Sequence, residues 1–302
     1  MAAGSVPVRA GLPVIGVRPW VMGIVNVTPD SFSDGGRWSD TGAAVQRGRD
    51  LVALGADLVD VGGESTRPGA HRVDADTEAA RVVPVIGELV ADGIACSVDT
   101  TRASVARSAL AAGASLVNDV SGGMADPEMA AMVADAGVPW ILMHWRGPSE
   151  FMQDLARYDD VVAEVRAELL ARVAAAVAAG VDERALILDP GIGFAKNADH
   201  NWAVLRRLDV LIDLGFPVLI GASRKRFLGE LLAGSDGSSR GAAEREDATA
   251  AVSAMAALDG VWGLRVHEPR PTRDALSVLE AYHRLSARTT AEGARVEGGG
   301  DG

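Results

Sequence analysis

The stretch LVALGADLVDVG, residues 51–62, decides the fold, because one glycine joins the end of a helix pattern to a short apolar run. Residues 42–54 have the apolar spacing of a helix, and residues 58–61 have the length and composition of a buried strand. Between them, Gly55 stands where a helix commonly closes with a left-handed residue, a conformation that glycine adopts without steric cost. We therefore predict a helix–turn–strand unit here.

The same unit recurs along the chain. Strand-like runs lie at 21–25, 58–61, 94–98, 115–117, 140–143, 186–188, 218–220 and 264–266, and candidate helices at 42–54, 76–92, 102–112, 127–136, 159–179, 200–214, 244–259 and 272–287. The seven helices that lead into another strand each end at a glycine: Gly55, Gly93, Gly113, Gly137, Gly180, Gly215 and Gly260. An open doubly wound sheet would also alternate, but eight near-equal units with short buried strands favour closure. The predicted fold is α/β, a single (β/α)8 TIM barrel.

The barrel is expected to occupy residues 19–287. Residues 1–18 form an N-terminal extension, and the Gly-rich, charged residues 288–302 form a flexible C-terminal tail. Residues 235–243 read as a flexible excursion within the seventh unit. Pro84 lies inside the second helix pattern, where we expect a kink or an early end.

Composition excludes several classes of protein. The chain has 29 Lys+Arg and 41 Asp+Glu, a formal net charge of −12, and no long basic run, so nucleic acid and anionic membranes are poor partners. No window approaches the about 20 apolar residues of a membrane span, and the N-terminus lacks a secretory apolar segment. Cys96 is the single cysteine, which excludes an intramolecular disulfide. We expect a cytoplasmic protein.

Polar residues follow every predicted strand. In a (β/α)8 barrel the carboxyl ends of the strands converge on one mouth, where the chemistry takes place. Asp60, Glu64 and Asp119 are more simply explained as helix caps or loop ties, whereas structural and ligand roles are evenly balanced for Asp99, Asn118 and Asp189. The long Gly-rich loops 28–40 and 62–72 are expected to act as lids at this mouth.

Cations gather after the last two strands. In GASRKRFLGELL, residues 221–232, Arg224, Lys225 and Arg226 crowd the start of a short helix, which opposes the helix dipole unless an anion binds there. Arg265 and His267 are two residues apart and would face the same way on a strand. We expect an anionic ligand near this seam, with a basic surface turn as the alternative. Zinc, iron, dinucleotide and P-loop patterns are missing from the sequence.

Eight motifs in order, one per strand exit, resemble the dihydropteroate synthase family, particularly its actinobacterial members. They are GIVNVTPDSFSDGG (23–36), VDVGGESTRPGA (59–70), SVDT (97–100), NDVSGG (118–123), LMHWR (142–146), LDPGIGFAK (188–196), GASRKRFLG (221–229) and LRVH (264–267). The resemblance implies a transferase of folate biosynthesis that joins 6-hydroxymethyl-7,8-dihydropterin diphosphate to 4-aminobenzoate and releases diphosphate. It further implies Mg²⁺ as cofactor, sulfonamides as competitive inhibitors and a homodimer.

The resemblance also assigns roles to residues. Asp99, Asn118 and Asp189 would hydrogen-bond the pterin edge, Lys225 would reach the ring acceptors, and Arg265 would stack on the pterin face. Asn26 and His267 would bind the diphosphate, Asn26 also lying at the magnesium. The aminobenzoate pocket would be formed by Thr66, Arg67, Pro68, Phe194 and Ser223, with Met143 also contacting substrate. The catalytic set implied is Lys225, Arg265, His267 and Asp34.

Two alternatives stay open at this stage. A pterin-binding methyltransferase domain belongs to the same superfamily but would not need the Ser-Arg-Lys turn or the Arg-x-His strand. A folate-binding or regulatory paralogue without catalysis is the other, and measured turnover would separate it from the enzyme.

Overall fold

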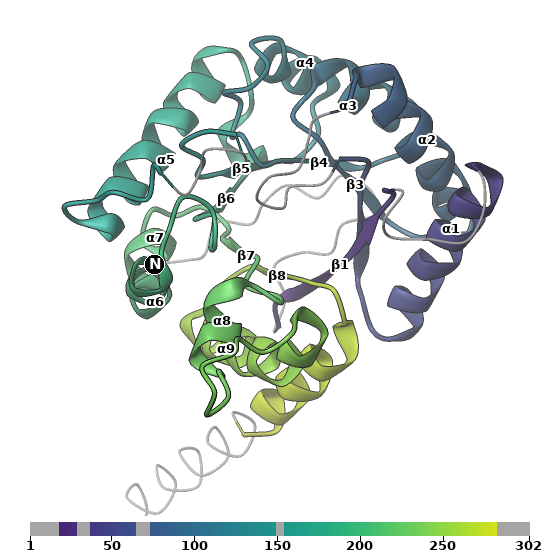
Figure 1. Ribbon diagram of the computed structural model, residues 1–302. Coiled ribbons are helices and arrows are strands. Elements are labelled where there is room, and N and C mark those ends of the chain that lie inside the picture. The colour runs from purple at the N-terminus through teal and green to yellow at the C-terminus, as the bar shows by residue number, and fades with distance from the viewer. Residues whose placement is uncertain (1–17, 29–36, 65–72, 149–153, 283–302) are drawn as a thin grey trace, which may run out of the picture.

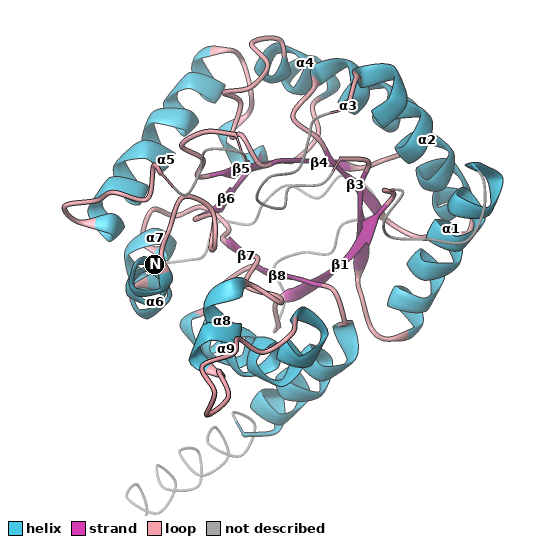
Figure 2. Ribbon diagram, viewed as in Figure 1, coloured by secondary structure: helices cyan, strands magenta, loops and turns pink. Residues whose placement is uncertain are grey.

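The computed structural model describes residues 18–28, 37–64, 73–148 and 154–282, and for residues 37–40 it describes the backbone alone. Eight parallel strands form one sheet, and helices surround it (Figures 1 and 2). The strands are β1 Trp20–Asn26, β2 Leu58–Gly62, β3 Cys96–Asp99, β4 Leu116–Asp119, β5 Trp140–Met143, β6 Leu186–Asp189, β7 Leu219–Ile220 and β8 Gly263–Val266. Each predicted strand is present, with limits that differ by at most two residues.

The sheet curls into a nearly closed barrel. Its strand order is β6-β5-β4-β3-β2-β1-β8-β7, so β1 pairs with both β2 and β8. The two end strands meet where Leu188 of β6 bridges Val218, the residue before β7. Because adjacent strands throughout are parallel, their carboxyl ends lie at one mouth. The predicted (β/α)8 barrel is confirmed.

Helices connect the strands on the outside of the barrel. They are α1 Arg37–Ala53, α2 Ala75–Ala91, α3 Ala103–Ala111, α4 Met129–Ala136, α5 Val161–Ala178, α6 Ala198–Arg206, α7 Leu208–Ile212, α8 Arg226–Leu231 and α9 Glu246–Asp259, with 3-10 turns η2 Glu183–Ala185 and η3 Ala242–Arg245. Residues 269–282 form one more helix after β8. The helix expected at 200–214 divides at Arg207, and α2 continues seven residues past Pro84, so the expected early end there is wrong.

The predicted glycine caps are confirmed. All seven glycines have positive φ, between +58° and +107°. Gly137 shows the arrangement well, because its φ of 58° and ψ of 40° place it in the left-handed region while its N–H donates to the Val133 carbonyl. Each cap turns the chain back towards the barrel, which explains why one of these glycines precedes each strand from β2 to β8.

Two apolar layers stabilise the barrel. Inside it, Met22, Leu58, Leu116, Ile141 and Ile187 pack together with Trp20 and Leu219. A larger cluster fills the space between the strands and the helices. The barrel is thus a packed core rather than a pore, which leaves its polar mouth as the place for ligands. None of the described helices is long and apolar enough to cross a membrane.

The sequence-based domain limits stay predictions, because residues 1–17 and 283–302 lie outside the described part of the chain. The excursion expected at 235–243 lies after α8 and includes the first two residues of η3, and its side chains are exposed.

Candidate active site

Strand register places four polar or small residues in one row at the mouth. Asn26 of β1 is level with Gly62 of β2, Gly62 with Asp99 of β3, and Asp99 with Asn118 of β4. Asp189 ends β6 and is level with Met143 of β5. The sequence-predicted residues Asn26, Asp99, Asn118, Met143 and Asp189 therefore all stand at the carboxyl ends of their strands.

Asp60 organises the polar side chains of this row. It is fully buried, and its carboxylate accepts hydrogen bonds from Ser97 Oγ at 2.6 Å, Asn118 Nδ2 at 2.8 Å and Arg265 Nε at 2.6 Å. A carboxylate can accept several such bonds at once, which offsets the cost of burying its charge. Asp60 thus ties β2, β3, β4 and β8 together, in keeping with its interpretation as a structural tie.

Arg265 joins this network to the ligand-facing carboxylates. Its second nitrogen, Nη2, lies 2.6 Å from Asp99 Oδ2. Burial raises the pKa of Asp99 to about 7, with Arg265 acting in the opposite direction. Burial also raises the pKa of Asp189, opposed by the Gly191 N–H, which donates to Oδ1 at 2.7 Å, and by Lys225. The mouth therefore holds two carboxyl groups that are shielded from water. Asp99 is bound by Arg265, and Asp189 is bound by the Gly191 N–H.

Lys225 and Phe194 meet beside these carboxyl groups. The Lys225 ammonium lies 4.1 Å from the centre of the Phe194 ring, a cation–π distance. Burial and the nearby Arg265 lower the pKa of Lys225 to about 8, while Asp189 and Asp99 favour its charged form. Phe194 packs in a small apolar cluster with Met143. This side of the mouth thus combines an aromatic ring with a buried ammonium group.

Ser223 and His267 form the next pair around the mouth. Ser223 Oγ lies 3.0 Å from His267 Nδ1 and accepts the His267 backbone N–H at 3.1 Å. Ser223 lies beyond β7 and His267 directly after β8, so this pair sits at the seam where an anion was expected. Arg265 and His267 contact different partners: Arg265 binds Asp60 and Asp99, whereas His267 binds Ser223.

The three cations stand at the start of α8 as expected, but two of them are paired with carboxylates. Arg224, which has a positive φ of 60°, is paired with Glu246, and Arg226 is paired with Glu230 at 3.2 Å on the surface. Of the three cations, Lys225 is the one that contacts the mouth. The two arginines balance their charge with carboxylates further along the chain, so no bound anion is needed to explain them.

Four predicted site residues lie outside the described part of the chain: Asp34, Thr66, Arg67 and Pro68. Most of the loops 28–40 and 62–72 lies there too, and their role as lids stays a prediction. At the base of the second loop, Glu64 Oε2 accepts from the Val73 N–H at 3.2 Å and from Arg102 at 3.0 Å. Asp119 accepts from Ser121 and Gly123 in the turn after β4. Both behave as the structural ties expected from sequence.

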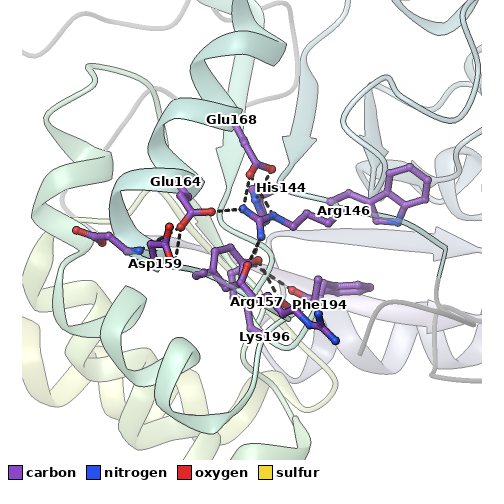
Figure 3. Close-up of polar contacts among 12 residues, drawn as sticks. His144, Arg146, Arg157, Asp159, Glu164, Glu168, Phe194 and Lys196 are labelled. Atoms are coloured by element: carbon purple, nitrogen blue, oxygen red, sulfur yellow. Dashed lines mark hydrogen bonds and ion pairs between the residues drawn. The ribbon is translucent and has the colours of Figure 1, made fainter. Parts of the chain in front are cut away.

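Sequence reasoning missed a polar network next to the mouth, between β5, α5 and the turn after β6 (Figure 3). Lys196 Nζ lies 3.0 Å from His144 Nδ1, and His144 Nε2 lies 3.0 Å from Glu168 Oε2. Arg146 binds both Glu168 and Glu164. The available signal was the rarity of lysine, since Lys196 and Lys225 are the two lysines of the chain.

Comparison with known proteins agrees with this geometry. The model of the family described as pterin binding enzyme matches residues 22–267. The dihydropteroate synthase of Mycobacterium leprae is 59% identical over 279 residues, which are 92% of this chain and 98% of that protein.

Solved structures of similar proteins add ligands to the comparison. A Xanthomonas albilineans dihydropteroate synthase with 4-aminobenzoic acid superposes with a TM-score of 0.83 at 47% identity, covering 90% of this chain and 95% of that one. A Yersinia pestis dihydropteroate synthase in a sulfonamide drug complex gives a TM-score of 0.84 at 38% identity, with 92% and 99% covered.

Proposed function

The chain belongs to the pterin-binding enzyme family and acts as a dihydropteroate synthase of folate biosynthesis, and we propose that the side chains at its barrel mouth carry out the condensation. The substrates are 6-hydroxymethyl-7,8-dihydropterin diphosphate and 4-aminobenzoate, and the products are 7,8-dihydropteroate and diphosphate. The observation that carries the assignment of residues is that the acceptors Asp99, Asn118 and Asp189 stand at strand ends around one mouth, with Arg265 on Asp99 and Lys225 near Asp189.

The pterin edge suits this row chemically. Its amino-pyrimidinone edge presents several N–H donors, and carboxylate and amide oxygens accept them. We assign the edge to Asp99, Asn118 and Asp189, and the ring acceptors to the Lys225 ammonium. Asp60 fixes Asn118 and Arg265 before the ligand arrives, so these two side chains lose little conformational entropy when the pterin binds. Arg265 is expected to lie along the pterin face.

The anion is assigned to the seam between β7 and β8. His267, held by Ser223, and Asn26 at the end of β1 would bind the diphosphate. Asn26 would also offer one amide oxygen to Mg²⁺, an ion that commonly combines one or two protein oxygens with substrate phosphates and water. When bound, the ion supplies positive charge to the leaving group. Among the described residues, no group of three or more His, Cys, Asp or Glu side chains could hold a metal.

Catalysis then consists of positioning and electrostatic stabilisation. The bond between the pterin methylene carbon and the diphosphate oxygen breaks, and the aryl amine of 4-aminobenzoate forms the new carbon–nitrogen bond and releases a proton. No protein nucleophile is required. Phe194, Met143 and Ser223 would shape the aminobenzoate pocket, with Thr66, Arg67 and Pro68 assigned to it by sequence resemblance and Asp34 added to the catalytic set. Sulfonamides would compete for the same pocket.

An assay with purified protein tests the function. The protein is mixed with pterin diphosphate and 4-aminobenzoate, with and without Mg²⁺, and formation of dihydropteroate is followed. We expect product only when both substrates are present, and Mg²⁺ to be required for full rate. Binding of both substrates without product would instead indicate a non-catalytic relative.

We also propose a homodimer. Among the described residues after β7, five large apolar side chains are more than half exposed: Leu231 on α8, Met255 and Leu258 on α9, and Val278 and Tyr282 in the helix 269–282. The last two helices are in contact, because Thr272 Oγ1 lies 3.4 Å from Ser253 Oγ (Figure 1). Apolar surface of this kind is typical of subunit interfaces. Sedimentation should give a dimer, and Met255→Glu with Val278→Glu should give a monomer.

A cytoplasmic location is the last part of the proposal. Its support is the buried free thiol of Cys96, the single cysteine of the chain, which suits a reducing compartment. Cell fractionation followed by detection of the protein tests it.

A further inference from the structure

Lys196 is a buried lysine with a complete set of partners inside the protein. Its side chain is almost fully buried, and Nζ lies 3.0 Å from His144 Nδ1, 3.2 Å from the Gly191 carbonyl oxygen and 3.2 Å from the Phe194 carbonyl oxygen. An ammonium group has three N–H donors and no acceptor. The three acceptors around Lys196 therefore match its charged form and leave no donor over.

This arrangement fixes the tautomer of His144. If Nδ1 accepts from the Lys196 ammonium, the proton of the neutral imidazole stands on Nε2, which then donates to Glu168 Oε2 at 3.0 Å. His144 is fully buried, and burial lowers its pKa to about 4, so the ring is neutral at ordinary pH. Glu168, His144 and Lys196 thus form a chain of hydrogen bonds from α5 to the turn after β6 (Figure 3).

The turn that Lys196 binds contains Phe194, whose aromatic ring lies in the candidate active site. Residues 190–195 lead from Asp189 to Lys196, and Ala195 has a φ of 46°, a left-handed conformation that costs energy for a residue with a side chain. The Tyr158 hydroxyl donates to the Ala195 carbonyl at 2.9 Å. Between the two carbonyls that Lys196 binds, the chain turns so that the Phe194 ring faces Lys225.

We propose that Lys196, held in place by His144 and Glu168, is a positioning residue that fixes the turn 190–195 and thereby the Phe194 ring against which 4-aminobenzoate packs. This inference rests on the proposed function. Lys196 itself does not touch substrate. It acts by drawing the Gly191 and Phe194 carbonyls towards one charged group, which keeps the strained turn in a single conformation.

The positioning depends on the charge of Lys196. A neutral amine has two N–H donors and one lone pair, so it faces three acceptors with one donor too few. Burial lowers the pKa of Lys196 to about 7; the charged form is favoured by Asp189 on β6 and Glu168 on α5 and disfavoured by Arg146 after β5 and Lys225 before α8. His144 and Tyr158 also face the group. Activity towards aminobenzoate should therefore fall as pH rises through this pKa.

The variant Glu168→Gln distinguishes the titration of Lys196 from that of Lys225, the other lysine of the chain. It removes a charge that favours the Lys196 ammonium, whereas the groups that set the pKa of Lys225 are Arg265, Asp189 and Asp99. The alkaline limb of kcat/KM for aminobenzoate should move to lower pH by about one unit. Glu164→Gln is the matched control, since Glu164 lies one turn earlier on α5 and also binds Arg146 but contacts neither His144 nor Lys196 in Figure 3. Equal profiles for the two variants would overturn the proposal.

Lys196→Met gives a second, independent measurement. Loss of the three donors should raise KM for aminobenzoate about tenfold or more, a loss typical of hydrogen bonds to a charged group, with little change in pterin affinity. Nitrogen-15 NMR of His144 should show the Nε2–H tautomer in the wild type and a changed ring signal in the variant. A loss of pterin affinity and of rate in proportion to the unfolded fraction would show a merely structural role and overturn the proposal.

The two proposals fail in different ways. If the wild type makes no dihydropteroate, the proposed function fails, while the His144 spectrum and the aminobenzoate affinity of the Lys196 variant still report on the turn. If the wild type turns over normally and Lys196→Met keeps the KM of the wild type, only the positioning role is wrong.

Discussion

Arg265 Nη2 lies 2.6 Å from Asp99 Oδ2, although β1 and β2 separate β8 from β3 in the sheet. The contact is possible because Arg265 reaches across the mouth of the barrel, with Nε held by the buried Asp60 at 2.6 Å. Two carboxylates thus share one guanidinium, whose planar fork suits such pairing. A pterin whose N–H groups donate to Asp99 would therefore bind beside Arg265, so the proposed edge recognition and ring stacking are coupled through this ion pair.

Lys225→Ala should lose most of the activity while the fold survives. The Lys225 ammonium lies at the mouth, 4.1 Å from the Phe194 ring centre. The two nearby carboxylates keep other partners when it is removed, because Asp189 accepts from the Gly191 N–H and Asp99 from Arg265. Lys225→Arg should restore little, because a planar guanidinium does not replace a compact ammonium. Steady-state rates and melting temperatures check this.

The neighbouring Arg226 is the control for Lys225. Its side chain is 70% exposed and pairs with Glu230 on the surface, so Arg226→Ala should keep near-wild-type turnover. Near-wild-type turnover in Lys225→Ala as well would refute the assignment of that lysine.

Diphosphate with Mg²⁺ should raise the melting temperature of the wild type. A ligand that binds only the native state stabilises it by mass action, by about 2.7 kcal/mol at a hundred times its dissociation constant. The rise should shrink in His267→Ala and in Asn26→Ala. If millimolar diphosphate gives no shift while the pterin does, the leaving group is held elsewhere than at the seam of β7 and β8.

Asp189→Ala should weaken pterin binding at least about tenfold, because hydrogen bonds to a charged group are worth about 1.5 to 3 kcal/mol each. Asp189→Asn is the matched variant, since an amide oxygen can still accept from the Gly191 N–H at the position that Asp189 Oδ1 occupies. Calorimetry measures both affinities. Unchanged affinity in Asp189→Ala would return this carboxylate to a structural role.

His144 should make folding stability depend on pH in the acid range. Its pKa is lowered by burial from 6.5 to about 4, so between these values the unfolded chain binds more protons than the native state does. Stability is then lost as pH falls below about 6.5, by up to about 3 kcal/mol near pH 4.

Comparison with His144→Gln isolates this contribution. A glutamine can accept from Lys196 and donate to Glu168, yet it does not titrate, so it retains the hydrogen-bond pattern of the ring. Urea unfolding of both proteins at pH 7.5 and pH 5 gives the difference. A wild type that loses no more stability than His144→Gln on acidification would contradict the prediction.

The regular parts of the fold were predictable from local sequence. Each glycine cap and strand is encoded within a few residues, so Gly137 and the run 140–143 could be located without any tertiary contact. The barrel mouth followed from the parallel order, which places Asp99, Asn118 and Asp189 at strand ends. Local patterns therefore gave the candidate positions.

Partners distant in sequence were not predictable in this way. The Asp60 contact with Arg265 joins residues 205 apart, and the Lys196 contact with His144 joins residues 52 apart. Neither pair shares a helix face or a strand, so no spacing rule indicates it. The same reason explains why the pairing of Arg224 was not predicted, because the carboxylate of Glu246 that binds it lies 22 residues further along the chain.

Aminobenzoate should bind only after the pterin and diphosphate are in place. The methylene carbon that its amine attacks belongs to the pterin, so in the proposed site the bound pterin would form one wall of the aminobenzoate pocket. Phe194 and Met143, which pack together, would provide only an apolar part of the rest. In the free protein, aminobenzoate would contact little surface. Its free energy of binding would therefore be too small to offset the cost of association. Labelled aminobenzoate and a sulfonamide should therefore bind detectably, and compete, only with pterin and diphosphate present. Equilibrium dialysis tests this order, and equal affinity for the free protein and the pterin–diphosphate complex would rule it out.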